Sequence, residues 1–181
     1  MLAIFLTIEN NTARTKAERL YLQYKYLLFS EANKILNDTH LAEDAVQQAF
    51  LRIIKNLHKI DEKNVPATRN FLVIICRNVS LDILRDRQYL NKNSDDIEDL
   101  EIENSEMSPA DIAVDNESVN RIVDMIKQLP PIYRDVILLK HSHNLSRDEI
   151  SQTLDVPLET VKKRLVRAKK MLAESLEREG I

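Results

Sequence analysis

The residues of this 181-residue chain that are best suited to bind a charged partner lie near its C-terminus. Between Glu159 and Lys170 there are six cations and one acid, although the whole chain has a formal charge of −3. Like charges three or four residues apart on a helix repel one another, so stability alone does not favour this pattern. A phosphate backbone makes the same charges favourable, and an α-helix fits the major groove of DNA. A basic face that is only solvated is the alternative.

Helical spacing divides this segment into two faces. One face is predicted to be buried and carries Val161, Leu165, Ala168 and Leu172. The other face carries cations and a hydroxyl but no acid. We predict that DNA is contacted by Thr160, Lys162, Lys163, Arg164 and Arg167.

A short capped helix precedes the basic segment. Ser146 and Glu149 have the spacing of a capping box, and Ile150 and Leu154 supply an apolar face. A break at residues 155–157 then separates the two helices. A short helix, a three-residue turn and a second, basic helix form the outline of a helix-turn-helix.

The first half of the chain has helical spacing in three segments, separated by a polar break at residues 37–39 and a polar loop at residues 60–69. Pro66 in that loop is a suitable helix start. The apolar residues that define the segments are Tyr21, Tyr24, Leu28, Ala32 and Ile35, then Ala42, Val46, Ala49, Ile53 and Leu57, and then Phe71, Leu72, Ile75, Val79 and Ile83.

The middle of the chain has a different composition. Residues 91–115 hold nine acids and one base, a net charge of −8 that leaves +5 for the rest of the chain. This segment has too few apolar residues to form a core. We therefore predict an all-α protein with two small helical domains: an N-terminal bundle over 1–90, an acidic linker over 91–117 and a C-terminal helix-turn-helix bundle over 118–181.

Several classes of function are not favoured. A chain with one glycine has no glycine-rich phosphate loop, and no nucleophile–base set stands out, so we predict no enzyme and no cofactor. His141 and His143 do not share a helix face, and Cys76 lies on an apolar stripe, so we predict no metal site. The apolar opening MLAIFLTI is too short to span a membrane. We expect no membrane insertion and a cytoplasmic location.

Three blocks of this sequence resemble the bacterial extracytoplasmic-function (ECF) sigma factors. LPPIYRDVILLKHSHNLSRDEISQTLDVPLETVKKRLVRAKKML is similar to their promoter-binding C-terminal domain. LAEDAVQQAFLRIIKNL and NFLVIICRNVSLDILRDR are similar to their N-terminal domain. The blocks stand in the family's order from about Thr15 onward. The chain departs from the family pattern in having Phe71 for Trp, Ser151 for Ala, and Asp155 and Glu159 for Gly.

The resemblance implies a protein that binds core RNA polymerase and promoter DNA without catalysing a reaction itself. The segment 41–57 would dock on a coiled coil of the polymerase's largest subunit, through Asp44, Gln47, Gln48, Leu51 and Lys55. The segment 71–87 and the loop before it would read the −10 element, through Lys63, Asn64, Arg77, Asn78, Asp82 and Arg85. The basic helix would read the −35 element. An ordinary wet surface, with Asp82 and Arg85 paired within one helix, is the alternative for the first two sites.

The resemblance also implies a monomer that an anti-sigma factor could hold at the membrane, and a regulon that answers stress or envelope signals. The acidic linker would pass through the polymerase cleft, or would screen the two basic domains. Two other functions remain open from the residues alone. A dimeric helix-turn-helix regulator would bind paired half-sites on naked DNA, and a pure interaction module would bind no DNA.

Overall fold

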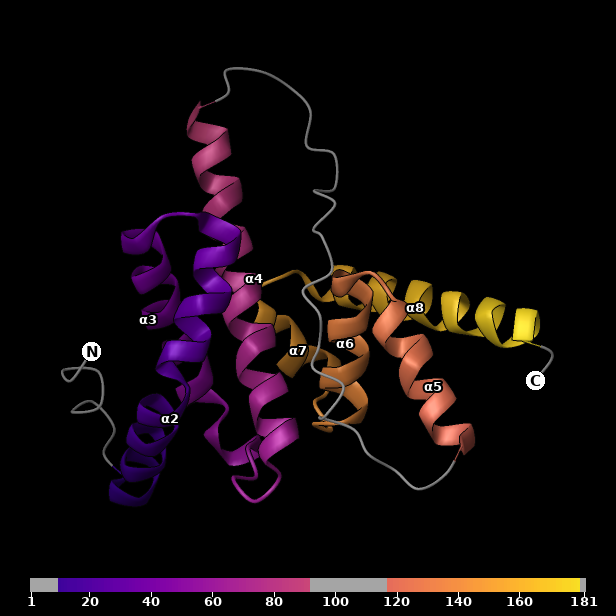
Figure 1. Cartoon of the computed structure of the whole chain (residues 1–181), viewed down its shortest axis with the longest axis horizontal. Coiled ribbons are helices and arrows are strands. Elements are labelled where there is room, and N and C mark those ends of the chain that lie inside the picture. Colours follow the sequence, from indigo (N-terminus) through magenta and orange to yellow (C-terminus); the bar gives the residue numbers. More distant parts are fainter. Residues whose placement is uncertain (1–9, 92–116, 180–181) are drawn as a thin grey trace. The chain divides into compact units, whose positions relative to one another are not determined.

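The computed structural model of this chain describes residues 10–91 and 117–179. All regular structure within these residues is helical, which confirms the predicted all-α class (Figure 1). The chain divides into two compact units, one up to Ile97 and one from Glu98 onward, and each unit is described by itself. Most of the acidic linker lies outside the described residues, so its conformation and the proposed domain boundaries at 90 and 118 stay predictions.

The first unit is a bundle of three long helices. These are α2 (Asn11–Leu36), α3 (Thr39–Lys55) and α4 (Val65–Asn91), with a short 3₁₀ helix, η1 (Leu57–Lys59), after α3. Each long helix packs against the other two, as Figure 1 shows. Leu28, Phe50 and Phe71, one residue from each helix, are completely buried in the shared core.

Polar residues set the boundary between α2 and α3. Asn37 has a left-handed backbone conformation with φ of 47°, which ends α2. The side chain of Asp38 then accepts hydrogen bonds from the backbone N–H groups of His40 and Leu41 and caps α3. The predicted polar break is therefore a capped reversal of the chain.

The apolar stripes follow the predictions in α3 and depart from them elsewhere. All five stripe residues predicted between Ala42 and Leu57 are buried, although Leu57 belongs to η1. Tyr21, Ile35 and Ile83 are only half-buried, which corrects the expected stripes of α2 and α4. In α2, Leu20 is buried in place of Tyr21, and Leu36 is buried in place of Ile35. The ring of Tyr21 lies at the edge of the core, where it meets Phe50 edge-on with centroids 5.0 Å apart. The residues buried in α2 are Ala17, Leu20, Tyr24, Leu28, Ala32 and Leu36.

The second unit contains the helix-turn-helix. Its helices are α5 (Glu117–Gln128), α6 (Pro131–His141), α7 (Arg147–Leu154) and α8 (Leu158–Glu179). The capping box at the start of α7 is present, with the backbone N–H of Glu149 donating to Ser146 Oγ and the backbone N–H of Ser146 donating to the Glu149 carboxylate. Asp155 ends α7 with a φ of 56°, at the break predicted for residues 155–157. The core of the unit includes Leu139, Leu145, Ile150, Leu154, Val161, Leu165 and Ala168.

A buried arginine joins α5 to α6. The side chain of Arg134 is 2% exposed, and its Nη1 donates a hydrogen bond of 3.1 Å to the backbone carbonyl of Lys127 in the last turn of α5. Cations interact favourably with the C-terminal end of a helix, where carbonyl groups lack partners within the helix. Arg134 therefore fixes the end of α5 against α6, across the Leu129–Pro130 joint.

The one cysteine provides a probe of the first unit. Cys76 is completely buried in α4, and its thiol lies 3.4 Å from the carbonyl oxygen of Leu28. Burial raises the pKa of this thiol to about 12. We predict that at pH 8 a thiol reagent labels the native chain at least about a thousandfold more slowly than the urea-unfolded chain, because only the thiolate reacts. Labelling of the native chain at the rate of a free thiol would contradict the observed packing.

The buried histidine of the second unit makes a prediction about pH. His143 is 9% exposed, and burial lowers the pKa of its imidazole to about 4. An imidazole in the unfolded chain titrates near 6.5, so unfolding takes up a proton between these two values. The contribution of His143 to the free energy of unfolding is therefore complete above about pH 6.5 and declines as the pH falls toward 4.

Urea unfolding measured at several pH values checks this, with His141→Gln as the matched control, because His141 is exposed two residues away. His141→Gln should keep the decline in stability between pH 6.5 and 4, and His143→Gln should reduce its slope by about one proton. Equal slopes in all three proteins would show that His143 does not carry the effect.

Candidate nucleic-acid and protein interfaces

The apolar stripe of α8 determines which side of this helix meets solvent. Val161, Leu165 and Ala168 are buried against the rest of the second unit, as predicted, whereas Leu172 is half-buried. The turn before α8 is held by a hydrogen bond of 2.6 Å from Ser151 Oγ to the carbonyl of Val156. The cations between the stripe positions are consequently directed away from the core.

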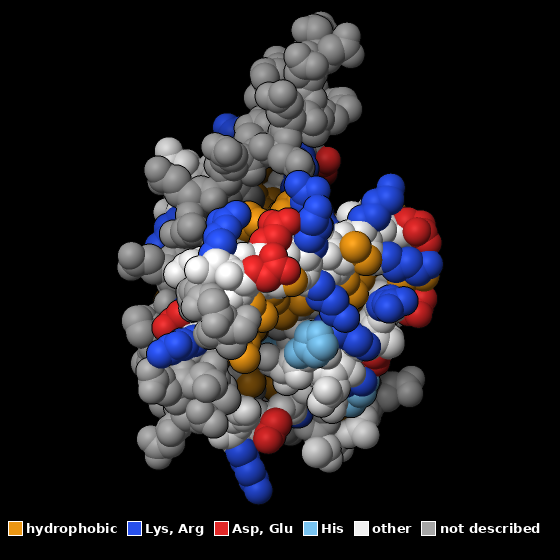
Figure 2. All heavy atoms as spheres, turned by 90° about the vertical axis from the view of Figure 1, so that its right-hand side faces the viewer, with side chains coloured by type: hydrophobic (Ala, Val, Ile, Leu, Met, Phe, Trp, Pro, Cys, Tyr) orange, Lys and Arg blue, Asp and Glu red, His pale blue; other side chains and the backbone are white. Residues whose placement is uncertain are grey.

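The five residues predicted to contact DNA lie on α8 with different exposures. Lys163 and Arg167 are exposed, and Thr160, Lys162 and Arg164 are half-buried. Lys162 Nζ lies 2.6 Å from a carboxylate oxygen of Glu159, and its hydrogen bond lowers the pKa of that carboxyl group. Glu159 therefore neutralises one cation at the start of α8, while Lys163 and Arg167 project into solvent. Figure 2 shows several Lys and Arg side chains at the surface, with acidic and apolar side chains among them.

Val166 is a surface residue of α8 that sequence reasoning did not single out. It is 70% exposed, and its neighbours three and four residues away are Lys162, Lys163, Lys169 and Lys170. An exposed branched apolar side chain adds nothing to a core, but side chains of this kind contact the methyl group of thymine in the major groove. The signal in the sequence was an apolar residue outside the helical stripe.

The outward face of α3 carries the predicted polymerase-binding residues. Asp44, Gln47, Gln48, Leu51 and Lys55 are all exposed. Leu51 is 46% exposed at the centre of this set, opposite the stripe that is buried against α2 and α4. The structure thus brings the five residues together on one helix face, where an apolar side chain is surrounded by amides and charges.

One predicted DNA contact on α4 is not at the surface. Arg77 is 4% exposed, which corrects the expectation that it lies beside Asn78 on the outward face. Its neighbours Cys76 and Val79 are completely buried. Ile74, Ser80 and Leu81 of α4 are buried as well, so the buried face of this helix is wider than the single stripe in the sequence indicates.

The other α4 residues take part in contacts within the protein. Asp82 lies 3.2 Å from Arg85 on the same helix and 3.5 Å from Arg52 on α3. The amide nitrogen of Asn78 donates to the carbonyl of Ile74. The intrahelical pair of Asp82 and Arg85, the alternative weighed in the sequence, is thus present, and Arg52 is a partner that the sequence did not reveal.

The loop before α4 holds its two predicted DNA contacts at the surface. Lys63 and Asn64 are exposed. The side-chain oxygen of Asn64 accepts a hydrogen bond from the backbone N–H of Ala67 at 3.2 Å, so Asn64 caps α4. The capping bond occupies that oxygen, and the amide nitrogen remains as a donor for a ligand.

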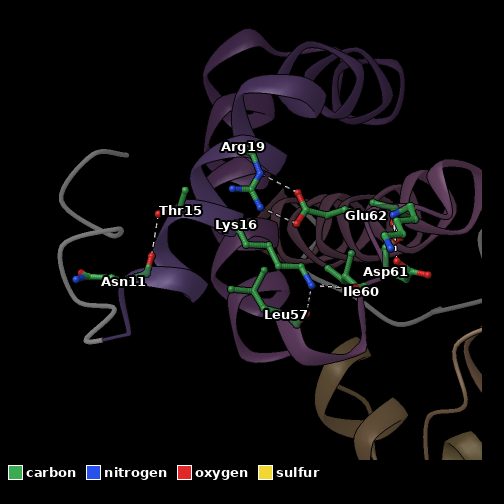
Figure 3. Close-up of polar contacts among 10 residues, drawn as sticks. Asn11, Thr15, Lys16, Arg19, Leu57, Ile60, Asp61 and Glu62 are labelled. Atoms are coloured by element: carbon green, nitrogen blue, oxygen red, sulfur yellow. Dashed lines mark hydrogen bonds and ion pairs between the residues drawn. The ribbon is translucent and has the colours of Figure 1, made fainter.

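Two cations of α2 reach this loop, and the sequence gave no sign of either contact (Figure 3). Lys16 Nζ donates to the backbone carbonyls of Leu57, at 2.8 Å, and Ile60. Arg19 binds both carboxylate oxygens of Glu62, at 3.1 and 2.8 Å. The hydrogen bond from Arg19 lowers the pKa of Glu62 and the same bond raises the pKa of Arg19. The partners are more than 40 residues apart in sequence, which hides them from any local pattern.

The described part of the chain contains no group of three or more His, Cys, Asp or Glu side chains arranged to hold a metal ion. His141 is exposed and His143 is buried, so the two histidines do not converge. Among the described helices, none combines the length and the apolar character that crossing a membrane requires.

Comparison with known families assigns both units. The family model for sigma-70 region 2 matches residues 20–90, and the model for sigma-70 region 4 matches residues 120–172. The first match contains α3, the loop and most of α4, and the second contains the helix-turn-helix. The candidate surfaces described above therefore lie within the two matched regions.

Individual relatives agree with this assignment. The chain is 32% identical over 160 residues to the ECF RNA polymerase sigma factor SigW of Bacillus subtilis (strain 168), covering 84% of each chain. It is 26% identical to SigM of the same organism, over 86% of this chain and 91% of the relative, and 24% identical to SigX, over 87% and 82%. Members of this family are transcription initiation factors rather than enzymes, and they act with core RNA polymerase on promoter DNA. This chain belongs to the family of ECF RNA polymerase sigma factors.

Proposed function

We propose that this sigma factor reads a −35 element with α8 and a −10 element with the loop before α4, and so directs transcription of a regulon that answers stress or envelope signals. The observation that carries the proposal is the outward face of α8, where Lys163 and Arg167 are exposed. The capped helix α7 and a left-handed turn at Asp155 precede α8 in the chain. Cations on this face attract phosphates, and arginine can bind the major-groove edge of guanine with two hydrogen bonds.

The proposed surface for the −10 element consists of the loop before α4 and the outward side of α4 itself. Lys63 and Asn64 supply an exposed cation and an exposed amide donor, which suit a phosphate and a base edge respectively. Asp82 and Arg85 form an ion pair of 3.2 Å, which competes with contacts of either side chain to DNA. Arg77 has no place in this surface because its side chain is buried.

The outward face of α3 is assigned to core polymerase. An exposed Leu51 ringed by polar side chains has the composition of a small hot spot within a polar rim. We further propose that the free protein is a monomer in the cytoplasm and that an anti-sigma factor holds it until the signal arrives. The acidic linker, with its charge of −8 over 91–115, would occupy a basic channel of the polymerase or screen the basic helices.

The experiment that tests the function as a whole combines the purified chain, core polymerase and promoter DNA. Strand opening near the −10 element should require both the chain and the polymerase. A free-standing helix-turn-helix regulator would be favoured by two results together. The mixture of chain, core polymerase and promoter would show no strand opening, and the chain alone would bind tightly to paired half-sites.

One prediction of the proposed function concerns the −35 contact. Arg167→Ala should weaken binding to the −35 element by about 1–3 kcal/mol and relax base preference at the position it contacts. Lys169→Ala should cause a smaller loss that is similar for all sequences and shrinks as salt rises. Binding of the reconstituted holoenzyme to matched and base-substituted −35 duplexes measures both effects.

Lys170→Ala is the matched control for these variants, since Lys170 is a cation of the same helix that already faces Glu174 at 3.8 Å. It should bind DNA nearly as the wild type does. Unchanged −35 preference in both Arg164→Ala and Arg167→Ala would reduce the basic face of α8 to a solvated surface.

Another prediction of the proposed function concerns the polymerase. Leu51→Glu or Asp44→Arg should abolish assembly with core polymerase while far-ultraviolet circular dichroism and the protection of Cys76 stay unchanged. Leu22→Glu is the control, because Leu22 is 66% exposed on α2 and has been assigned no role. Normal recovery of core polymerase with both α3 variants would remove this face from the proposed function.

A further inference from the structure

We infer that Lys16 and Arg19 of α2 are positioning residues for promoter reading: they fix the segment 57–64, which carries Lys63 and Asn64, in one conformation before DNA binds. We call Lys16 and Arg19, with their acceptors on Leu57, Ile60 and Glu62, the loop clamp. The inference rests on the proposed role of this loop at the −10 element. Its evidence is the set of contacts in Figure 3.

Lys16 holds the beginning of the segment. Its ammonium group donates to the carbonyl oxygens of Leu57 and Ile60, the first and last positions around η1. The carbonyl of Leu57 also accepts the backbone N–H of Ile60 at 3.2 Å, and a cation near the end of a helix is favourable. The half-buried Lys16 thus fixes the direction in which the chain leaves α3 and η1.

Arg19 holds the next part of the segment, one turn further along α2. Its guanidinium binds both carboxylate oxygens of Glu62, and this two-point geometry fixes orientation as well as distance. Glu62 immediately precedes Lys63, so an unpaired carboxylate there would repel a phosphate close to the proposed contact. Arg19 therefore both positions the loop and cancels a charge that opposes DNA.

The far end of the segment is fixed from α4. Asp61 accepts hydrogen bonds from the backbone N–H of Lys63 and, through its carbonyl, from the hydroxyl of Thr68. Asn64 caps α4 through Ala67. With the loop clamp at one side and the α4 cap at the other, Lys63 and Asn64 are exposed on a backbone that is bonded on both flanks, so little ordering remains to be done when DNA binds.

Stability alone gives a weak reason for the loop clamp. Exposed ion pairs contribute little to folding, and Arg19 is exposed. The same helix contains a pair of the ordinary local kind, Arg14 with Glu18 at 3.2 Å, four residues apart. The Arg14 pair connects α2 only to itself, whereas the Arg19 pair spans 43 residues to reach the loop. The contrast supplies a matched control.

The test uses the full chain in reconstituted holoenzyme, on a promoter with its −10 element either matched or substituted at single bases. Strand opening is measured by permanganate reactivity. Arg19→Glu and Lys16→Met should each reduce the ratio of opening on matched to substituted promoters by about tenfold, the size of one lost base contact. Binding to the −35 duplex should not change. Arg19→Glu combined with Glu62→Arg should restore the ratio, and Arg14→Glu should behave as the wild type.

Several outcomes would overturn the inference. These are a wild-type ratio in both Arg19→Glu and Lys16→Met, an equal fall on matched and substituted promoters, and a failure of the charge-swapped pair to recover. If Cys76 of the Arg19→Glu variant reacts quickly with a thiol reagent, the first unit is no longer intact, and Arg19→Gln replaces that variant in the test. Arg19→Gln removes the ion pair without placing two acids together. A wild-type ratio in that variant contradicts the positioning role. If wild-type holoenzyme opens no promoter, the proposed function fails and this inference fails with it.

Discussion

The burial of the apolar stripe of α8 is the constraint that orients the proposed DNA-binding face of this protein. With Val161, Leu165 and Ala168 in the core, the helix cannot rotate, and Lys163 and Arg167 must face solvent. Rotating it by one residue would expose three apolar side chains and bury cations, which costs far more than any surface contact can return. The same division operates in α3, where the buried residues from Ala42 to Ile53 leave Leu51 outside. The hydrophobic core thus determines the orientation of both proposed interfaces.

Much of the fold follows from local chemistry that can be read in the sequence. The capping box at Ser146 and the break that Asp155 begins are decided within a few residues, and the structure has both where the sequence predicted them. The stripe of α3 was also predictable, because its steps of three and four residues follow the period of a helix. Arg77 shows where this reasoning fails: α4 also buries Ile74, Ser80 and Leu81 outside its predicted stripe, so its buried face is wide, and a residue that looks lateral in the sequence lies inside. The Lys16 and Arg19 contacts could not be predicted, since their partners lie more than 40 residues away.

The scarcity of glycine shapes the turns. The three non-glycine residues with positive φ in the described parts of the chain are Asn37, Asn144 and Asp155. Asn and Asp tolerate this region better than other side chains because a short polar group can bond locally. At Asp155 the choice also places an acid beside the start of the basic helix, where glycine would place none. In the turn of the helix-turn-helix, Asp155 therefore contributes a negative charge as well as the left-handed backbone conformation.

Some cations of the proposed binding surfaces form ion pairs with acids of this protein, whereas the lysines next to them are exposed to solvent. Glu62 engages Arg19, and Glu159 engages Lys162, in each case next to an exposed lysine, Lys63 or Lys163. Exposed pairs of this kind are worth little in water, so a phosphate can compete for the cation at small cost. The released carboxylate would then lie near DNA and oppose binding. If these surfaces bind DNA as proposed, each acid favours geometries in which the neighbouring lysine takes the phosphate and the original pair survives.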